Sequence, residues 1–215
     1  MTTIAVIGAT GFAGGHITAE ALARGYDVIA VARDTDGLTP GEHLTLRPGD
    51  LFDALFVEAL ARDADVVVLA VPGREIRGRK AVDAVPALTD AVVEYRRRLG
   101  VVSGAASLQV SADGPRLIDT PDFPDEYRPE ALGTWAVLDE LERTLENVNW
   151  FAVSPSAVFG RDQDVPARGT YRLGGDVLLT EPDGNSSIAG ADFATAFVDE
   201  IASPTHYRER FTVGY

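Results

Sequence analysis

The chain has 215 residues, of which 46% are hydrophobic and 24% charged, as expected for a globular domain with one sizeable core. The absence of cysteine excludes disulfides, thiolate metal sites and a cysteine nucleophile, and a net charge of −14 argues against binding to nucleic acid or an anionic membrane surface. No apolar run approaches the roughly 18 residues of a membrane span, and the N-terminus lacks a basic leader. We therefore expect a single cytoplasmic domain over residues 1–215.

The first half of the chain alternates short apolar runs with helical patterns. The runs predict strands at 4–7, 26–32, 44–46, 66–71 and 100–103, and the patterns predict helices through 17–22, over 54–60 with Asp53 as the cap, and over 81–98. Fully apolar strands that alternate with helices favour a parallel sheet covered on both faces. The predicted fold is α/β, a doubly wound parallel sheet (Rossmann fold).

The rhythm changes after residue 103. Residues 104–133 form a long irregular stretch, and loops of this length are often functional. A helix with one apolar stripe follows, then a strand at 150–154, a hairpin around 171–179 and a helix near 192–201. We expect residues 155–190 to form a small C-terminal extension on the substrate side. The stripe consists of Leu132, Trp135, Leu138, Leu141 and Leu145.

The stretch GATGFAG follows the first predicted strand and opens a helix. Gly8 permits a tight exit from the strand, Gly11 permits close approach of a pyrophosphate, and Gly14 permits close packing of the helix on the sheet. Free N–H groups at the helix start favour an anion, so the context predicts dinucleotide binding. The predicted contacts in this turn are Gly8, Thr10, Gly11, Phe12, Ala13 and Gly14.

Residues after the next strands complete the predicted cofactor site. Arg33 follows the second strand where an acid would favour NAD, so we predict pairing with the 2′-phosphate of NADP. Asp34 comes next, which keeps NAD possible and leaves a solvated arginine as the alternative. Asp50 is placed to meet the adenine amino group, or else serves as a turn residue. Leu51 and the wall residues Ala70, Val71 and Pro72 belong to the same predicted site.

The motifs GATGFAG, VARD, GDLFD, LAVPG and SPSAVFG occur here in an order that resembles the short-chain dehydrogenase/reductase superfamily. The chain is most similar to its atypical NAD(P)H-binding branch, which includes NADH-flavin reductases, biliverdin IXβ/flavin reductase and NmrA-like proteins. The resemblance implies a nicotinamide cofactor and places Pro155 and Phe159 near its nicotinamide end. Core packing is the other interpretation of Phe159.

The chain departs from the superfamily at the Tyr-x-x-x-Lys pair. Lys80 is the only lysine, and Ile76 stands four residues before it. The nearest tyrosine motif, YRPEA, has Ala131 in place of the lysine that follows Tyr127. A tyrosine without a neighbouring cation is a poor acid near neutrality, so alcohol oxidation and sugar-nucleotide epimerisation by that pair are disfavoured.

Hydride transfer to an acceptor that is already electrophilic needs less help from the protein. We therefore expect an NADPH-dependent reductase of a flavin-, quinone- or tetrapyrrole-like acceptor. Ser103 or Ser107 would hydrogen-bond the acceptor or the carboxamide, and Tyr127 would orient the acceptor. The alternatives are serines satisfied by backbone and a tyrosine that packs in a loop.

Other candidates are weaker. Arg168, Tyr171 and Arg172 form either a rim over the site or a solvated hairpin, and His16 lies either near the pyrophosphate or on a helix surface. The three histidines are too scattered to predict a metal site. A dinucleotide-binding sensor without turnover is the alternative function. We expect a small-molecule acceptor as partner and a monomer or homodimer.

Overall fold

A computed structural model describes residues 2–35 and 37–215 of the chain. Within these residues, eight strands form one sheet in the order β3-β2-β1-β4-β5-β6-β8-β7. Neighbouring strands are parallel except β7 and β8, which are antiparallel. The strands are β1 (Thr3–Ile7), β2 (Asp27–Ala32), β3 (Leu44–Pro48), β4 (Val66–Leu69), β5 (Arg98–Val102), β6 (Trp150–Ser154), β7 (Arg172–Gly174) and β8 (Glu209–Gly214).

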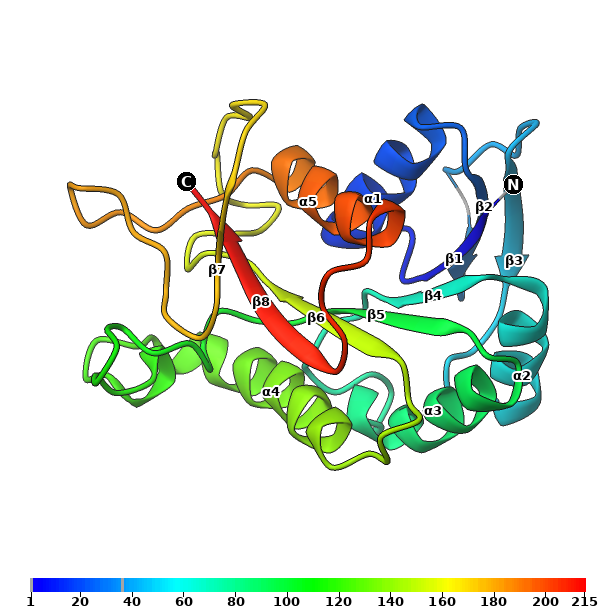
Figure 1. Cartoon of the computed structure of the whole chain (residues 1–215), viewed down its shortest axis with the longest axis horizontal. Helices are drawn as coiled ribbons and strands as arrows, with labels where there is room; N and C mark the ends of the chain where they lie inside the picture. Colours follow the sequence, from blue (N-terminus) through cyan, green and yellow to red (C-terminus); the bar gives the residue numbers. More distant parts are fainter. Residues whose placement is uncertain (1, 36) are drawn as a thin grey trace.

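Helices cover both faces of the sheet. Figure 1 shows α1 and α5 on one face and α2, α3 and α4 on the other. The helices are α1 (Phe12–Ala23), α2 (Ala54–Asp63), α3 (Val85–Glu94), α4 (Arg128–Glu142) and α5 (Gly190–Ala202), with short 3₁₀ turns η1 (Ala81–Ala84), η2 (Leu117–Asp119) and η3 (Asp125–Tyr127). This arrangement confirms the predicted doubly wound α/β fold.

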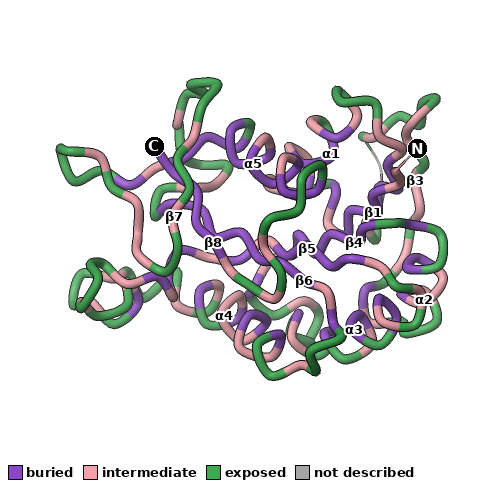
Figure 2. Tube along the Cα trace, viewed as in Figure 1, coloured by how far each residue is buried: buried purple, intermediate pink, exposed green. Residues whose placement is uncertain are grey.

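Two apolar cores lie on either side of the sheet because successive strand residues point to opposite faces. Along β1, Ile7 joins the core under α2 and α3, which includes Leu60 and Leu88. Its neighbour Val6 joins the core under α1 and α5, which includes Phe193. The central strands are consequently buried on both sides, as Figure 2 shows, and this explains why their sequences are apolar throughout.

The helix predicted over residues 81–98 is wrong at both ends. It begins as the 3₁₀ turn η1 and ends at Glu94, after which Arg96 takes a left-handed φ of 54°. Arg98 already belongs to β5, where its buried guanidinium donates 2.6 Å and 2.7 Å hydrogen bonds to the carbonyls of Glu200 and His206. A buried arginine in a strand carries the same sequence signal as an exposed arginine on a helix, so the pattern extended the helix too far.

The hairpin predicted around residues 171–179 is also wrong. β7 pairs with β8, about 40 residues further along the chain, with Arg172 opposite Gly214. β8 itself was not predicted, although it is inserted between β6 and β7. Its partners are distant in sequence, so no local turn signal marks it.

The apolar stripe predicted for the fourth helix is only partly buried. Leu138 and Leu141 are buried in the core, whereas Leu132 and Leu145 are 52% and 76% exposed. α4 starts at Arg128 and stops at Glu142, so Leu145 lies beyond the helix. Among the described residues, no helix combines the length and apolar character required to cross a bilayer.

Candidate cofactor-binding site

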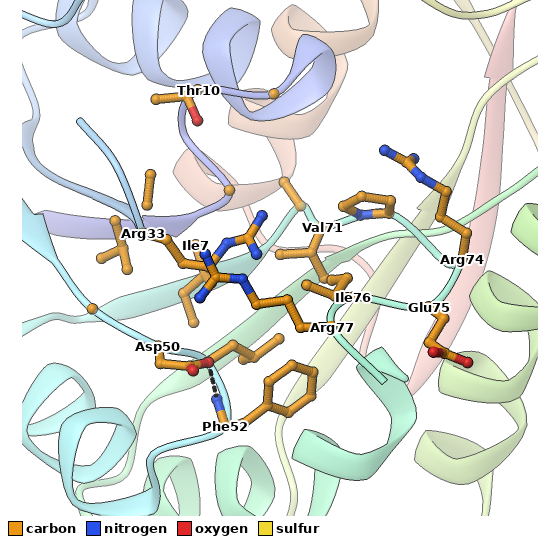
Figure 3. Close-up of a pocket in the computed structure, with 18 residues that line it drawn as sticks. Ile7, Thr10, Arg33, Asp50, Phe52, Val71, Arg74, Glu75, Ile76 and Arg77 are labelled. Atoms are coloured by element: carbon orange, nitrogen blue, oxygen red, sulfur yellow. Dashed lines mark hydrogen bonds between the residues drawn. The ribbon is translucent and has the colours of Figure 1, made fainter. Parts of the chain in front are cut away.

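A cavity of about 460 Å³ opens at the carboxyl ends of β1, β2 and β4 (Figure 3). The sheet order reverses between β1 and β4, and ligands of doubly wound sheets bind in the crevice at such a reversal. We call this cavity the cofactor cleft. Several predicted residues line it: Gly8, Thr10, Gly11, Arg33, Asp50, Leu51, Ala70, Val71 and Pro72.

The glycine turn is shaped by two steric requirements. Gly8 has a φ of 93°, and a Cβ there would lie 2.3 Å from the carbonyl oxygen of Ala70. A Cβ on Gly14 would lie 2.2 Å from the carbonyl oxygen of Gly8. Gly11 has an ordinary φ of −75°, and its Cβ would meet nothing closer than 3.1 Å. Gly8 and Gly14 are therefore required by the fold, whereas Gly11 is not constrained in this way.

The start of α1 offers unpaired N–H groups. Gly11 is the N-cap residue, no side chain caps the helix, and the first turn has no acidic residue. The amides of Phe12, Ala13 and Gly14 precede the first intrahelical bond, which Gly15 donates to the carbonyl of Gly11. A pyrophosphate would accept these hydrogen bonds and be favoured by the helix dipole.

Arg33 and Asp50 reach the cofactor cleft from neighbouring strands. Arg33 is exposed just after β2, and its side chain extends across the cleft in Figure 3. Asp50 accepts a 3.0 Å hydrogen bond from the amide of Phe52, so one carboxylate oxygen serves the turn before α2. Leu51 is 6% exposed and belongs to the floor of the cleft.

A segment that the sequence reasoning missed forms one wall of the cleft. Arg74, Glu75, Ile76 and Arg77 line the cavity after Pro72. Glu130 of α4 anchors the start of this segment, accepting hydrogen bonds of 2.7 Å and 3.1 Å from the amides of Gly73 and Arg74. The basic run in VPGREIRGRK was the available signal, but sequence alone does not tell which of its cations turn back toward the sheet.

Ser103 stands at the carboxyl end of β5 and is 4% exposed. Its amide donates a 2.9 Å hydrogen bond to the carbonyl of Val153, whereas its Oγ has no hydrogen-bond partner among the described residues. Ser107 differs, because its Oγ accepts a 3.1 Å hydrogen bond from Arg210 of β8. Neither serine lines the cofactor cleft, and of the two Ser103 is the one whose buried hydroxyl has no partner among the described residues.

The remaining candidates lie outside the cofactor cleft. Tyr127 is 53% exposed at the start of α4, and Pro155 is buried after β6. Phe159 packs on Phe12 and Phe193, with ring centroids 5.1 Å and 4.7 Å apart, which is the core-packing alternative. Phe12 also meets His16, whose pKa is lowered by burial, beside a second cavity of about 150 Å³.

The predicted rim residues are all held by neighbours. Arg168 forms a 2.7 Å ion pair with Glu181, and Arg172 donates a 2.8 Å hydrogen bond to the carbonyl of Thr180. Tyr171 donates a hydrogen bond to Asp199 of α5. Burial and this carboxylate raise the pKa of Tyr171 to about 12, so its hydroxyl would be a poor proton donor to a substrate.

The fold, the glycine turn and the cleft at the sheet reversal together define a dinucleotide-binding protein of the Rossmann type. Residues 8–204 match the NAD(P)H-binding family, and the chain belongs to that family. A protein of Bacillus subtilis called YwnB, itself uncharacterized, is 37% identical over 98% of this chain and 97% of its own length.

Two solved structures are similar to this chain over nearly its whole length. A Bacteroides thetaiotaomicron protein provisionally named an epimerase has a TM-score of 0.86 and 31% identity, covering 100% of this chain and 97% of its own. A Streptococcus pneumoniae protein provisionally named an NADH-flavin reductase has a TM-score of 0.79 and 32% identity, covering 100% and 99%. The NAD(P)H-binding family predicted from the sequence is thereby confirmed, and the likeness to a protein named as an NADH-flavin reductase agrees with the predicted branch. A nicotinamide nucleotide is the cofactor of this family, and NAD(P)H-dependent redox chemistry is the general class of reaction.

Proposed function

We propose that this protein is an NADPH-dependent reductase that transfers hydride to a flat, electrophilic acceptor of the flavin, quinone or tetrapyrrole type. The observation that carries the proposal is the lack of a Tyr-x-x-x-Lys pair in a chain whose only lysine, Lys80, follows Ile76 by four residues. Without that pair the protein has no activated tyrosine to protonate an alkoxide. An acceptor that stabilises its own negative charge after hydride transfer does not require such a proton donor.

Each candidate residue is assigned a role in binding the cofactor or the acceptor. The amides at the start of α1 would hold the pyrophosphate, Asp50 the adenine and Arg33 the ribose 2′-phosphate. When bound, the cofactor supplies the hydride. Ser103, at the carboxyl end of β5, would hold the carboxamide or a polar atom of the acceptor through its unpartnered Oγ.

Cofactor oxidation tests this function directly. Purified protein is mixed with NADPH, and the absorbance at the reduced-nicotinamide band is followed after addition of FMN, a benzoquinone or biliverdin. We expect acceptor-dependent oxidation with at least one of the three, slowed by Ser103→Ala. Binding of NADPH with no oxidation across the panel would favour the alternative, a dinucleotide-binding sensor without turnover.

A further inference from the structure

Two guanidinium groups reach into the cofactor cleft from opposite walls. Arg33 enters from the end of β2 and Arg77 from the segment after β4, and Figure 3 shows both side chains extended toward the middle of the cavity. Neither guanidinium has a hydrogen-bond or ion-pair partner among the residues that the structure describes. Arg74 on the same segment is different, since it pairs with Glu130 at 3.6 Å.

Two unpaired cations at one cavity repel each other unless an anion lies between them. The chain has 33 acidic residues against 19 basic ones, so carboxylates are plentiful. The cleft itself is lined by the carboxylates of Asp50 and Glu75, and neither forms an ion pair with these arginines. The lining holds three arginines against two carboxylates, and the two guanidinium groups without a partner suit a ligand group with more than one negative charge.

The backbone at Arg77 has the strained, left-handed conformation that is often found at functional sites. Residues Ile76 and Arg79 exchange two backbone hydrogen bonds of 2.7 Å and 3.1 Å, which close a two-residue turn over Arg77 and Gly78. Both central residues have positive φ, 52° and 79°. Turns of this kind favour Asn-Gly, and a long side chain at the first position is strained. The turn nevertheless presents an arginine to the cleft.

We propose that Arg77 is a second specificity-determining residue, which binds the ribose 2′-phosphate of NADP(H) from the side opposite to Arg33. The inference rests on the proposed NADP preference and adds the residue that completes it. A phosphate monoester carries close to two negative charges at neutral pH and has three acceptor oxygens, enough for one guanidinium on each side. NAD(H) lacks this phosphate and would leave the guanidinium groups of Arg33 and Arg77 without a partner.

The test compares ligands that differ only in this phosphate. Calorimetry with adenosine 2′,5′-bisphosphate and with 5′-AMP, followed by NADP⁺ and NAD⁺, measures the preference without any need for turnover. The variants are Arg33→Ala, Arg77→Gly, the double variant, and Arg79→Ala as a control, an arginine of the same segment that does not line the cleft. Glycine is chosen at position 77 because it accepts the left-handed turn, so the variant folds.

We expect Arg77→Gly to weaken the 2′-phosphorylated ligands by about 10- to 100-fold and to leave 5′-AMP and NAD⁺ within about two-fold. The double variant should lose the preference for the 2′-phosphate entirely, and Arg79→Ala should keep it. The preference should also fall as the pH drops below about 6, where the phosphate takes up a proton.

Each other outcome overturns the inference in a distinguishable way. If Arg77→Gly weakened the binding of ligands with and without the 2′-phosphate equally, Arg77 would contact a group that NAD and NADP share. No change with Arg77→Gly, together with a loss in Arg33→Ala, would refute the role of Arg77 and leave the proposed NADP preference intact. A wild-type protein that binds both classes equally would refute the preference itself, and the assignment of Arg77 with it.

Discussion

The glycines of the opening turn differ in how strongly the fold requires them. Gly14 is constrained by the fold, because a Cβ there would lie 2.2 Å from the carbonyl oxygen of Gly8. Gly11 is not, because it has an extended backbone and its Cβ would lie 3.1 Å from the same atom, a contact that a small shift relieves. The sequence predicted helix packing for Gly14 and ligand approach for Gly11, and the geometry supports the packing role of Gly14.

Gly14→Ala should therefore act mainly on stability, and Gly11→Ala mainly on the affinity for the cofactor. We expect Gly14→Ala to lower the free energy of unfolding by about 1–3 kcal/mol through overpacking. Gly11→Ala should cost about 0.5–1 kcal/mol of stability, because alanine is a poorer N-cap than glycine, and weaken NADP⁺ binding about tenfold or more by hindering the pyrophosphate. Urea unfolding and calorimetry measure the two quantities. Equal affinity of Gly11→Ala and wild type would contradict the role given to this residue.

Residues of the site were predictable where they follow a strand directly. Arg33 comes immediately after β2 and Asp50 shortly after β3, and the carboxyl ends of parallel strands meet at one edge. Arg77 lies beyond a loop and enters the cleft only because the turn at residues 76–79 reverses the chain. That reversal depends on two positive φ angles, one of them at an arginine, for which sequence propensity gives no signal.

At the scale of elements, the contact between α4 and the segment after β4 positions one wall of the cleft. A Cβ on Gly133 would lie 1.7 Å from the carbonyl oxygen of Gly73, and a Cβ on Gly73 would lie 2.2 Å from that of Glu130. The carboxylate of Glu130 then caps the amides of Gly73 and Arg74. Helix and loop backbones therefore touch, and the helix holds the wall in place.

Gly133→Ala should transmit a steric change from the helix to the cleft. The added methyl must push the segment carrying Arg77 away from α4, so we expect NADP⁺ to bind at least about tenfold more weakly. Ala136→Gly on the same helix is the control, since it carries only the helix-propensity cost of about 1 kcal/mol. Calorimetry on both variants at a temperature where each is folded gives the answer. Unchanged affinity in Gly133→Ala would show that the contact does not position the wall.

Elements were predictable in proportion to how local their signals are. The run of residues 150–154 reproduces β6 because five consecutive buried residues at a sheet centre leave no other pattern. β7 and β8 were misread because each takes its register from a strand far away in sequence. Arg98 shows the other limit, since a charged side chain buried by a distant partner imitates a helix surface.

At the scale of the whole molecule, a buried ionic network ties the chain's end to the sheet. Arg98 of β5 pairs with Glu200 of α5, and the guanidinium stacks 4.2 Å over the ring of Phe151. Glu200 also accepts hydrogen bonds from Thr205 and from the amide of His206, at 2.7 Å and 3.0 Å, in the connection that leads to β8. The network fixes that connection and thereby the place of β8 beside β6.

This network should make the protein sensitive to acid. Burial by itself raises the pKa of Glu200, but the hydrogen bonds from Arg98, His206 and Thr205 outweigh it and lower the pKa from 4.5 to about 2. As the pH falls, the unfolded chain takes up this proton before the folded protein does. The contribution of the group, on the order of 3 kcal/mol, is therefore complete above about pH 4.5 and is lost progressively down to about pH 2.

Glu200→Gln tests the network against Glu209→Gln, which removes an exposed carboxylate from β8. Near neutral pH we expect Glu200→Gln to destabilise the protein by about 3–5 kcal/mol, because the buried guanidinium of Arg98 loses its counter-ion. The difference between wild type and Glu200→Gln should narrow as the pH falls below 4.5, because the wild type then approaches the protonated state that glutamine imitates. Glu209→Gln should differ little from wild type throughout. Thermal unfolding from pH 7 to pH 3 measures these differences, and a gap that stays constant with pH would show that the charge of Glu200 does not stabilise the fold.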